Sequence, residues 1–134
     1  MIKIAHRGNL LGRNQEKENT VQYIKDALAL GYHVEIDIRY INGTFFLGHD
    51  FPQEEVTEEF LENSYIIAHA KNIEALIMML KNKKIHCFWH EGDQFTITSN
   101  RWIWKYPEVY YNGKVIAECS DNRGIKNNDL GRYR

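Results

Sequence analysis

The stretch "YHVEIDIRYI" at residues 32–41 decides the fold, because its apolar and polar side chains alternate strictly. Val34, Ile36 and Ile38 fall on one side of an extended chain, and Glu35, Asp37 and Arg39 fall on the other. Such alternation predicts a β-strand with one face in the core. Asn42-Gly43 follows directly and indicates a hairpin turn.

Strands and helices are expected to alternate on both sides of this stretch. The expected strands are 2–6, 44–50, 64–71, 85–93, two short strands within 94–107, and 114–119. The expected helices are 20–30 (capped by Asn19 or Thr20), a short acidic helix at 53–62, and 72–84 (capped by Asn72). Strands that alternate with helices predict a mostly parallel sheet with the helices outside it.

Length and charge limit the class of protein. A chain of 134 residues predicts one domain over 1–134, with a polar tail at about 120–134 that we expect to fray. The net charge of −1 argues against a nucleic-acid partner. No run is long enough to span a membrane, and no signal-peptide core is visible, so a cytoplasmic protein is expected. Cys87 and Cys119 lie in apolar runs and are expected to be buried thiols.

Chemically capable side chains gather where the expected strands end. They are His6, Arg7, Glu35, Asp37, His49, Asp50, His69, Lys71, His90, Glu91 and Asp93. Functional sites of parallel α/β folds form at the carboxyl ends of the strands. The sequence therefore predicts one site at this edge of the sheet.

The pair Glu35 and Asp37 is the most informative part of that site. Residues two apart on a strand point to the same side, so the two carboxylates would repel each other. A hard divalent cation, Mg²⁺ or Ca²⁺, would resolve the repulsion. The alternative is a solvated strand face that Arg39 continues.

Four short motifs carry a resemblance to a known family: H-R-G at 6–8, E-N-T at 18–20, E-I-D at 35–37 and G-H-D at 48–50. In this order they resemble the glycerophosphodiester phosphodiesterases. The superfamily also holds the phosphatidylinositol phospholipases C and the spider-toxin phospholipases D. The resemblance covers about the first 50 residues, and "AHAK" at 68–71 matches more loosely.

This resemblance implies a TIM-barrel (phospholipase C-like) fold and metal-dependent hydrolysis of a phosphodiester. A short chain leaves few loops around the site, so the substrate would be small: a glycerophosphodiester or a phosphodiester-linked sugar or headgroup. The implied roles are acid–base catalysis by His6 and His49, cation binding by Glu35 and Asp37, and phosphate binding by Arg7 and Lys71. Supporting roles fall to Glu18, Asn19, Asp50, His90 and Asp93.

The sequence departs from the family on the strand at 64–71. The family has a Glu-x-Lys pattern there, whereas this chain has His69-Ala70-Lys71. The third metal ligand is therefore His69 or comes from Glu91 or Asp93.

The chain is short for a TIM barrel, which typically needs about 250 residues. We therefore expect a shortened TIM-barrel-like fold, with β/α units in its first half and mostly strands and loops in its second. Aromatic residues crowd the second half: Trp102, Trp104, Tyr106, Tyr110 and Tyr111. They would form core and barrel closure, a homo-oligomer interface, or a platform for a sugar ring.

Three other functions stay open at this stage. One is a non-catalytic module that binds a phosphorylated ligand on a degenerate barrel. Another is a cyclising lyase like the bacterial phospholipases C, against which the pair Glu35 and Asp37 argues. The third is a zinc hydrolase that uses His69 and His90, but no tight zinc motif is present, so Zn²⁺ is less expected than Mg²⁺ or Ca²⁺.

Overall fold

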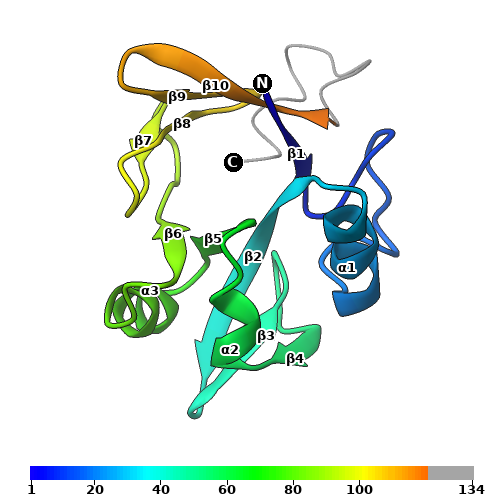
Figure 1. The fold of residues 1–134 in the computed structure, drawn as a ribbon. Coiled ribbons are helices and arrows are strands. Elements are labelled where there is room, and N and C mark those ends of the chain that lie inside the picture. Colours follow the sequence, from blue (N-terminus) through cyan, green and yellow to red (C-terminus); the bar gives the residue numbers. More distant parts are fainter. Residues whose placement is uncertain (121–134) are drawn as a thin grey trace.

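Residues 1–120 are described by a computed structural model, in which they form one mixed, ten-stranded sheet with a few helices (Figure 1). The frayed tail expected at 120–134 lies, apart from Ser120, outside the described residues.

The strands and helices follow the order expected from the sequence, with two short strands added, at Glu54–Val56 and Glu108–Tyr111. The strands are β1 (Ile2–His6), β2 (His33–Ile41), β3 (Thr44–Leu47), β4 (Glu54–Val56), β5 (Ile66–Ala70), β6 (His86–Phe88), β7 (Thr96–Ile97), β8 (Ile103–Lys105), β9 (Glu108–Tyr111) and β10 (Lys114–Cys119). The helices are α1 (Val21–Ala29), α2 (Glu58–Leu61) and α3 (Ile73–Leu80).

Strand β2 organises the sheet, as its alternating sequence predicts. It pairs in parallel with β1 near its start and with β5 along most of its length, and its end pairs with β3 in antiparallel fashion. The register sets His6 opposite Glu35 and sets Asp37 opposite His69. The two carboxylates of β2 are therefore flanked by an imidazole on each neighbouring strand.

The expected shortened TIM barrel is wrong, because the sheet is open. Its strand order runs β4-β3-β2-β1-β10-β9-β8-β7, with β5 and β6 added beside β2. In the described part of the chain β6 and β7 form no ladder, although the N–H of Ser99 donates to the carbonyl of Cys87 at 2.8 Å. A β/α barrel closes through parallel strands of matched tilt and stagger. Here β7, β8, β9 and β10 pair in antiparallel fashion with no helices between them. The antiparallel pair β3 and β4 extends the sheet beyond β2, where a barrel would have another parallel strand.

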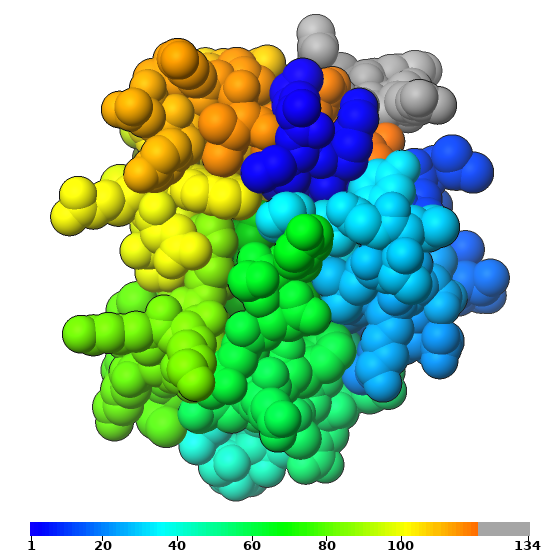
Figure 2. Space-filling view, in the orientation of Figure 1, coloured from blue at the N-terminus to red at the C-terminus, as the bar shows by residue number. Residues whose placement is uncertain are grey.

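The sheet has a hydrophobic core on each face. Helices α1 and α3 cover the face that carries Val34, Ile36 and Ile38 (Figure 1). The other face holds a second core, formed by Ile4, Ile67, Phe88, Trp104, Val109, Ala117 and Cys119. Figure 2 shows the orange C-terminal strands lying against the blue N-terminal strand, as the parallel pairing of β1 with β10 requires. This second face also carries the side chains of Glu35 and Asp37.

Two expectations of local structure need correction. Residues 53–62 were expected to be one helix, but Glu54–Val56 pairs with β3, and only Glu58–Leu61 is helical. The free edge of β3 outweighs the helical preference of the glutamates, and Thr57 caps the shorter helix. Strand β9 was not expected as a separate strand. The expected caps Thr20 and Asn72 are both confirmed.

Within residues 1–120, no helix is long and apolar enough to cross a membrane. Cys87 and Cys119 are buried and are not linked to each other. Trp104 is buried in the second core, whereas Tyr111 is 46% exposed. A homo-oligomer stays a prediction.

Candidate functional site

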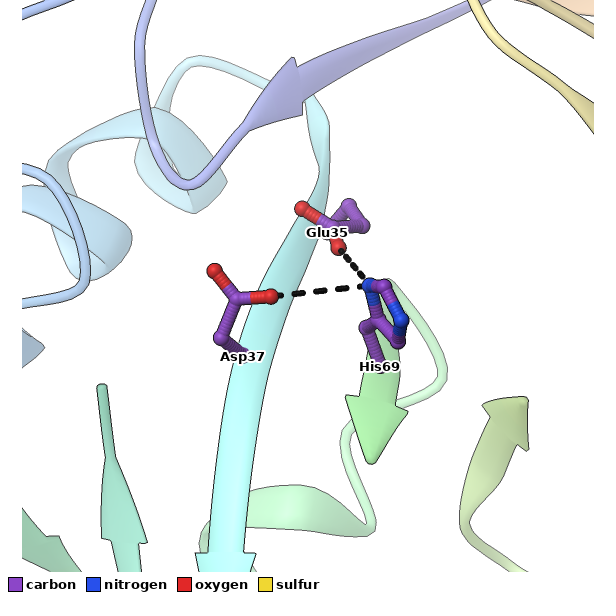
Figure 3. A group of neighbouring side chains, drawn as sticks. All are labelled: Glu35, Asp37 and His69. Carbon is purple, nitrogen blue, oxygen red and sulfur yellow. Dashed lines mark ion pairs between the residues drawn. The ribbon is translucent and has the colours of Figure 1, made fainter. Parts of the chain in front are cut away.

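Three buried side chains converge on the inner face of the sheet to form a group that could hold a metal ion (Figure 3). Glu35 and Asp37 come from β2, and His69 comes from the neighbouring strand β5. The Nδ1 atom of His69 lies 3.6 Å from Glu35 Oε2 and 3.6 Å from Asp37 Oδ1. The potential ligand atoms of these three residues all lie within 4.8 Å of one another. We call Glu35, Asp37 and His69 the metal group. His69 is thus brought to the carboxylates, as the sequence allowed.

The carboxylate of Glu35 has unusual surroundings for a buried charge. It is 1% exposed, and neither of its oxygens accepts a hydrogen bond from the described residues. The nearest basic atoms to it are two imidazole nitrogens, His69 Nδ1 at 3.6 Å and His6 Nε2 at 3.5 Å. A buried carboxylate without hydrogen bonds is costly. A bound cation would remove that cost.

Asp37 is held more firmly than Glu35. The Asn19 side chain donates from Nδ2 to Asp37 Oδ2 at 2.9 Å and accepts from the Asp37 backbone N–H at 3.0 Å. Arg7 Nε lies 3.0 Å from the same Oδ2, which leaves Oδ1 directed at His69. Burial alone would raise the pKa of Asp37, but Arg7 and then His69 outweigh burial and hold the pKa well below its usual range. Asp37 is therefore ionised at neutral pH.

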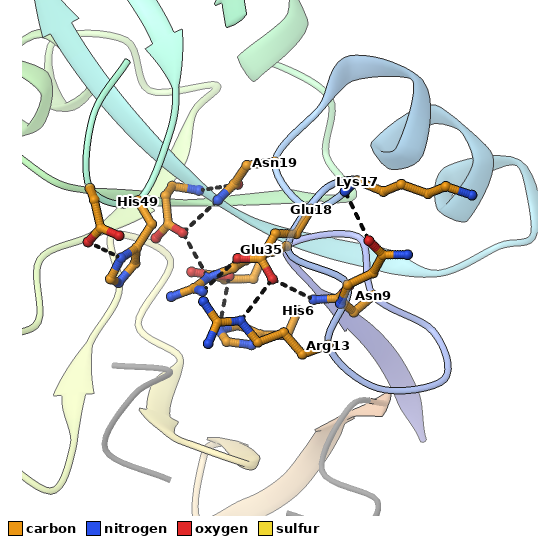
Figure 4. A network of polar contacts seen from close by, with 12 residues as sticks. His6, Asn9, Arg13, Lys17, Glu18, Asn19, Glu35 and His49 are labelled. Carbon is orange, nitrogen blue, oxygen red and sulfur yellow. Dashed lines mark hydrogen bonds and ion pairs between the residues drawn. The ribbon is translucent and has the colours of Figure 1, made fainter. Parts of the chain in front are cut away.

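Arg7 joins the metal group to the loop that follows β1. Figure 4 shows the surrounding polar network, in which Glu18 and Asn19 of that loop lie near Glu35. Its side chain is 1% exposed and contacts Asp37 through Nε and Glu18 through Nη1, the latter at 2.9 Å. Burial opposes the charge, but Asp37, Glu35 and Glu18 together raise the pKa of Arg7. Arg7 is thus the buried counter-charge of the site, and its expected contact with phosphate stays a prediction.

Sequence reasoning missed two residues that fix this loop. Asn9 Nδ2 donates to Glu18 Oε1 at 3.5 Å, and Arg13 Nε donates to the same oxygen at 3.2 Å. Asn9 also accepts from the backbone N–H of Asn14 at 3.0 Å. No sequence signal pointed to these contacts, because both residues stand in a polar loop whose path brings them to Glu18.

The ring of His69 is held in place by contacts on the side away from the carboxylates. Its Nε2 lies 3.0 Å from the carbonyl oxygen of His90, and its ring stacks on Phe88 with centroids 4.6 Å apart. The ring of His90 turns the other way, toward the backbone carbonyl of Asp93. Glu91 and Asp93 are exposed and do not join the metal group.

His49 stands on the more open side of the site, with its side chain 26% exposed. Its Nδ1 bonds to Asp50 Oδ1 at 2.9 Å, a bond that lowers the pKa of Asp50. Its Nε2 is buried and has no hydrogen-bond partner within residues 1–120. Arg39 fixes the turn by donating to the carbonyls of Gly48 at 3.2 Å and His49 at 2.6 Å.

Most of the expected site residues therefore lie together. His6, Arg7, Glu18, Asn19, Glu35, Asp37 and His69 form the buried network. His49 and Lys71 lie close enough to Asp37 for their charges to help lower its pKa. The backbone N–H of Lys71 donates to the carbonyl of Ile38 at 2.8 Å, which ties Lys71 to β2.

Gly48 is expected to be irreplaceable in the turn that carries His49. A Cβ at this position would lie 1.9 Å from the carbonyl oxygen of Phe51, and the φ of Gly48 is 150°. We expect Gly48→Ala to lower the free energy of unfolding by about 3 kcal/mol or more, measured by urea denaturation.

The control for this prediction is Gly43→Ala, at a position where φ is 82° and no atom lies within 4 Å of the added Cβ. We expect it to cost only about 1–2 kcal/mol, since it carries the conformational penalty alone. Equal losses in the two variants would contradict the steric role of Gly48.

No protein-family model, curated protein or solved structure matches the chain. The function therefore has to be inferred from the residues of the site and their geometry.

Proposed function

We propose that the protein is a divalent-metal-dependent phosphodiesterase that hydrolyses a small glycerophosphodiester or a phosphodiester-linked sugar or headgroup. The observation that carries this proposal is the buried metal group, in which both oxygens of Glu35 and the Oδ1 of Asp37 have no hydrogen-bond partner among the described residues. The imidazoles of His6 and His49 beside it add groups suited to proton transfer. The resemblance of the four motifs to glycerophosphodiester phosphodiesterases points to the same chemistry.

The residues of the metal group fit a divalent cation. Glu35, Asp37 and His69 would hold it with two carboxylates and one imidazole. When bound, such an ion supplies positive charge that stabilises the phosphoryl oxygens. Arg7 neutralises part of the carboxylate charge and keeps Asp37 Oδ2 in place.

The two remaining imidazoles suit the proton transfers of phosphodiester cleavage. In neutral His49, the Nδ1–H donates to Asp50 and leaves the lone pair on Nε2, which has no partner in the described residues. His6 presents its Nε2 to Glu35 at the other end of the site. One imidazole would take the proton of the nucleophile, and the other would protonate the leaving oxygen.

The substrate would approach from the side of His49. The metal group and His6 are nearly inaccessible, at 2% exposure or less, whereas the His49 side chain is 26% exposed. Lys71 lies partly exposed near Asp37 and would place an ammonium charge beside the phosphate. The exposed part of the site thus combines an imidazole with a cation.

Replacing His49 with glutamine tests its catalytic role. We expect His49→Gln to lower kcat for bis(p-nitrophenyl) phosphate by about 10²–10⁴-fold, the usual worth of acid–base catalysis. Metal affinity should stay unchanged, because His49 is not part of the metal group. Phosphorus NMR of the products would separate hydrolysis from formation of a cyclic phosphate.

The control is His33→Gln, which removes a half-buried imidazole that stacks on Tyr65 at the start of β2. It should retain wild-type kcat. If His49→Gln is as active as this control, His49 has no part in the proton transfers.

A further inference from the structure

The metal group offers one nitrogen and two oxygens, rather than oxygens alone. Mg²⁺ and Ca²⁺ are hard cations that take oxygen ligands. Imidazole nitrogen favours ions such as Zn²⁺, Fe²⁺ and Co²⁺, whose affinity for such sites rises along the first transition row. The third donor therefore decides the class of ion.

The hydrogen bond between His69 and the backbone of His90 determines which ring nitrogen of His69 has a lone pair available to a metal ion. Its Nε2 lies 3.0 Å from the carbonyl oxygen of His90, and a carbonyl only accepts. Nε2 therefore carries the proton, and in the neutral ring Nδ1 has the free lone pair. A backbone carbonyl that fixes the remote N–H is the usual companion of a metal-bound histidine.

The distances inside the group fit an ion between the side chains better than a direct ion pair. A protonated Nδ1 would bond to a carboxylate at about 2.7–2.9 Å. Here both separations are 3.6 Å, and neither Glu35 Oε2 nor Asp37 Oδ1 has a hydrogen-bond partner among the described residues. Bonds of about 2.0–2.2 Å in tetrahedral geometry place ligand atoms about 3.4 Å apart.

We propose that the metal group selects a first-row transition dication of the Zn²⁺ class over Mg²⁺ and Ca²⁺, and that His69 sets this preference. The inference rests on the metal centre of the proposed function, but not on cleavage of a phosphodiester. It differs from the expectation of Mg²⁺ or Ca²⁺, which considered the two carboxylates of β2. Three protein ligands leave a coordination position open, as in catalytic zinc sites.

The test compares metals on the full chain after a chelator has stripped it. Zn²⁺, Co²⁺, Mn²⁺, Mg²⁺ and Ca²⁺ are titrated in competition with a chromophoric chelator, and the visible absorption of the Co²⁺ form reports on its ligands. Wild type should bind Zn²⁺ and Co²⁺ at least about 100-fold more tightly than Mg²⁺ or Ca²⁺.

The variant His69→Asp restores an all-oxygen ligand set. It should lower Zn²⁺ affinity by about 100-fold, since even outer partners of metal ligands are worth about 10–100-fold. It should also change the Co²⁺ spectrum while Mg²⁺ affinity stays within about threefold of wild type. His33→Gln, which removes an imidazole outside the metal group, should leave Zn²⁺ affinity and the Co²⁺ spectrum unchanged.

Two results would overturn the inference. One is wild-type affinity for Mg²⁺ or Ca²⁺ that equals its affinity for Zn²⁺, a result that stands even if His69→Asp fails to fold. The other is a folded His69→Asp protein with full Zn²⁺ affinity. Selective Zn²⁺ binding without phosphodiester cleavage by any metal form would instead overturn the proposed function and leave this inference intact.

Discussion

Glu35→Gln is expected to abolish metal binding and to lower phosphodiesterase activity by at least about 10³-fold, because a catalytic cation contributes several kcal/mol. The metal-free variant should be as stable as wild type or more so. The reason is that the substitution removes a buried charge whose oxygens accept no hydrogen bond within the described chain.

The measurement is chemical denaturation with and without the preferred ion. At an ion concentration 100 times Kd, the wild type should gain about 2.7 kcal/mol, and the variant should gain nothing. Glu55→Gln, which makes the same change on the exposed face of β4, should gain as much as wild type. A metal-free Glu35→Gln protein that is several kcal/mol less stable than wild type would show that Glu35 is structural.

Arg7→Met should be the most destabilising single substitution in the site, at about 3–5 kcal/mol, because removing one partner strands buried charges. Arg7 is 1% exposed and contacts both Glu18 and Asp37. Methionine retains much of the volume but leaves both carboxylates without their guanidinium. Urea denaturation at neutral pH gives the loss.

The pH dependence of this loss identifies its electrostatic origin. Arg7 is the strongest of the charges that hold the pKa of Asp37 below its usual range. Asp37 therefore stabilises the wild type above about pH 4, and this contribution disappears as the pH falls. Arg7→Met lacks most of that contribution at every pH, so the difference in stability between the two proteins should shrink in acid.

Arg13→Met is the matched control, since Arg13 bonds to the same Glu18 from a position that is 24% exposed. It should cost less than about 1 kcal/mol. A loss for Arg7→Met that stays constant from neutral pH into acid would mean that lost packing, not charge, explains the destabilisation.

The sequence predicted the local elements around β2 well because they depend on local signals. Alternation identified β2, the helical period identified α1 and α3, and Thr20 and Asn72 cap those helices as expected. The sheet's closure could not be predicted in this way. A series of β/α units fixes which strands are parallel neighbours, but whether the last strands close a ring depends on their direction and tilt.

The sequence predicted the strand residues of the candidate site but not the contacts made by its loop. Position on a strand sufficed to place Glu35 and Asp37 on one face, and the family resemblance offered His69 as one of three possible third ligands. The side on which a loop folds back could not be read from the sequence, so Asn9 and Arg13 were missed as partners of Glu18. Glu91 was equally plausible by residue type, but it follows β6 into solvent.

The most direct test of the proposed function is hydrolysis of bis(p-nitrophenyl) phosphate by chelator-treated protein to which single cations are restored, with Glu35→Gln assayed beside wild type. The proposed function predicts release of nitrophenol that requires a divalent cation and disappears in the variant. Release that survives the chelator, or that Glu35→Gln retains at the wild-type rate, would contradict a metal-dependent phosphodiesterase centred on Glu35, Asp37 and His69.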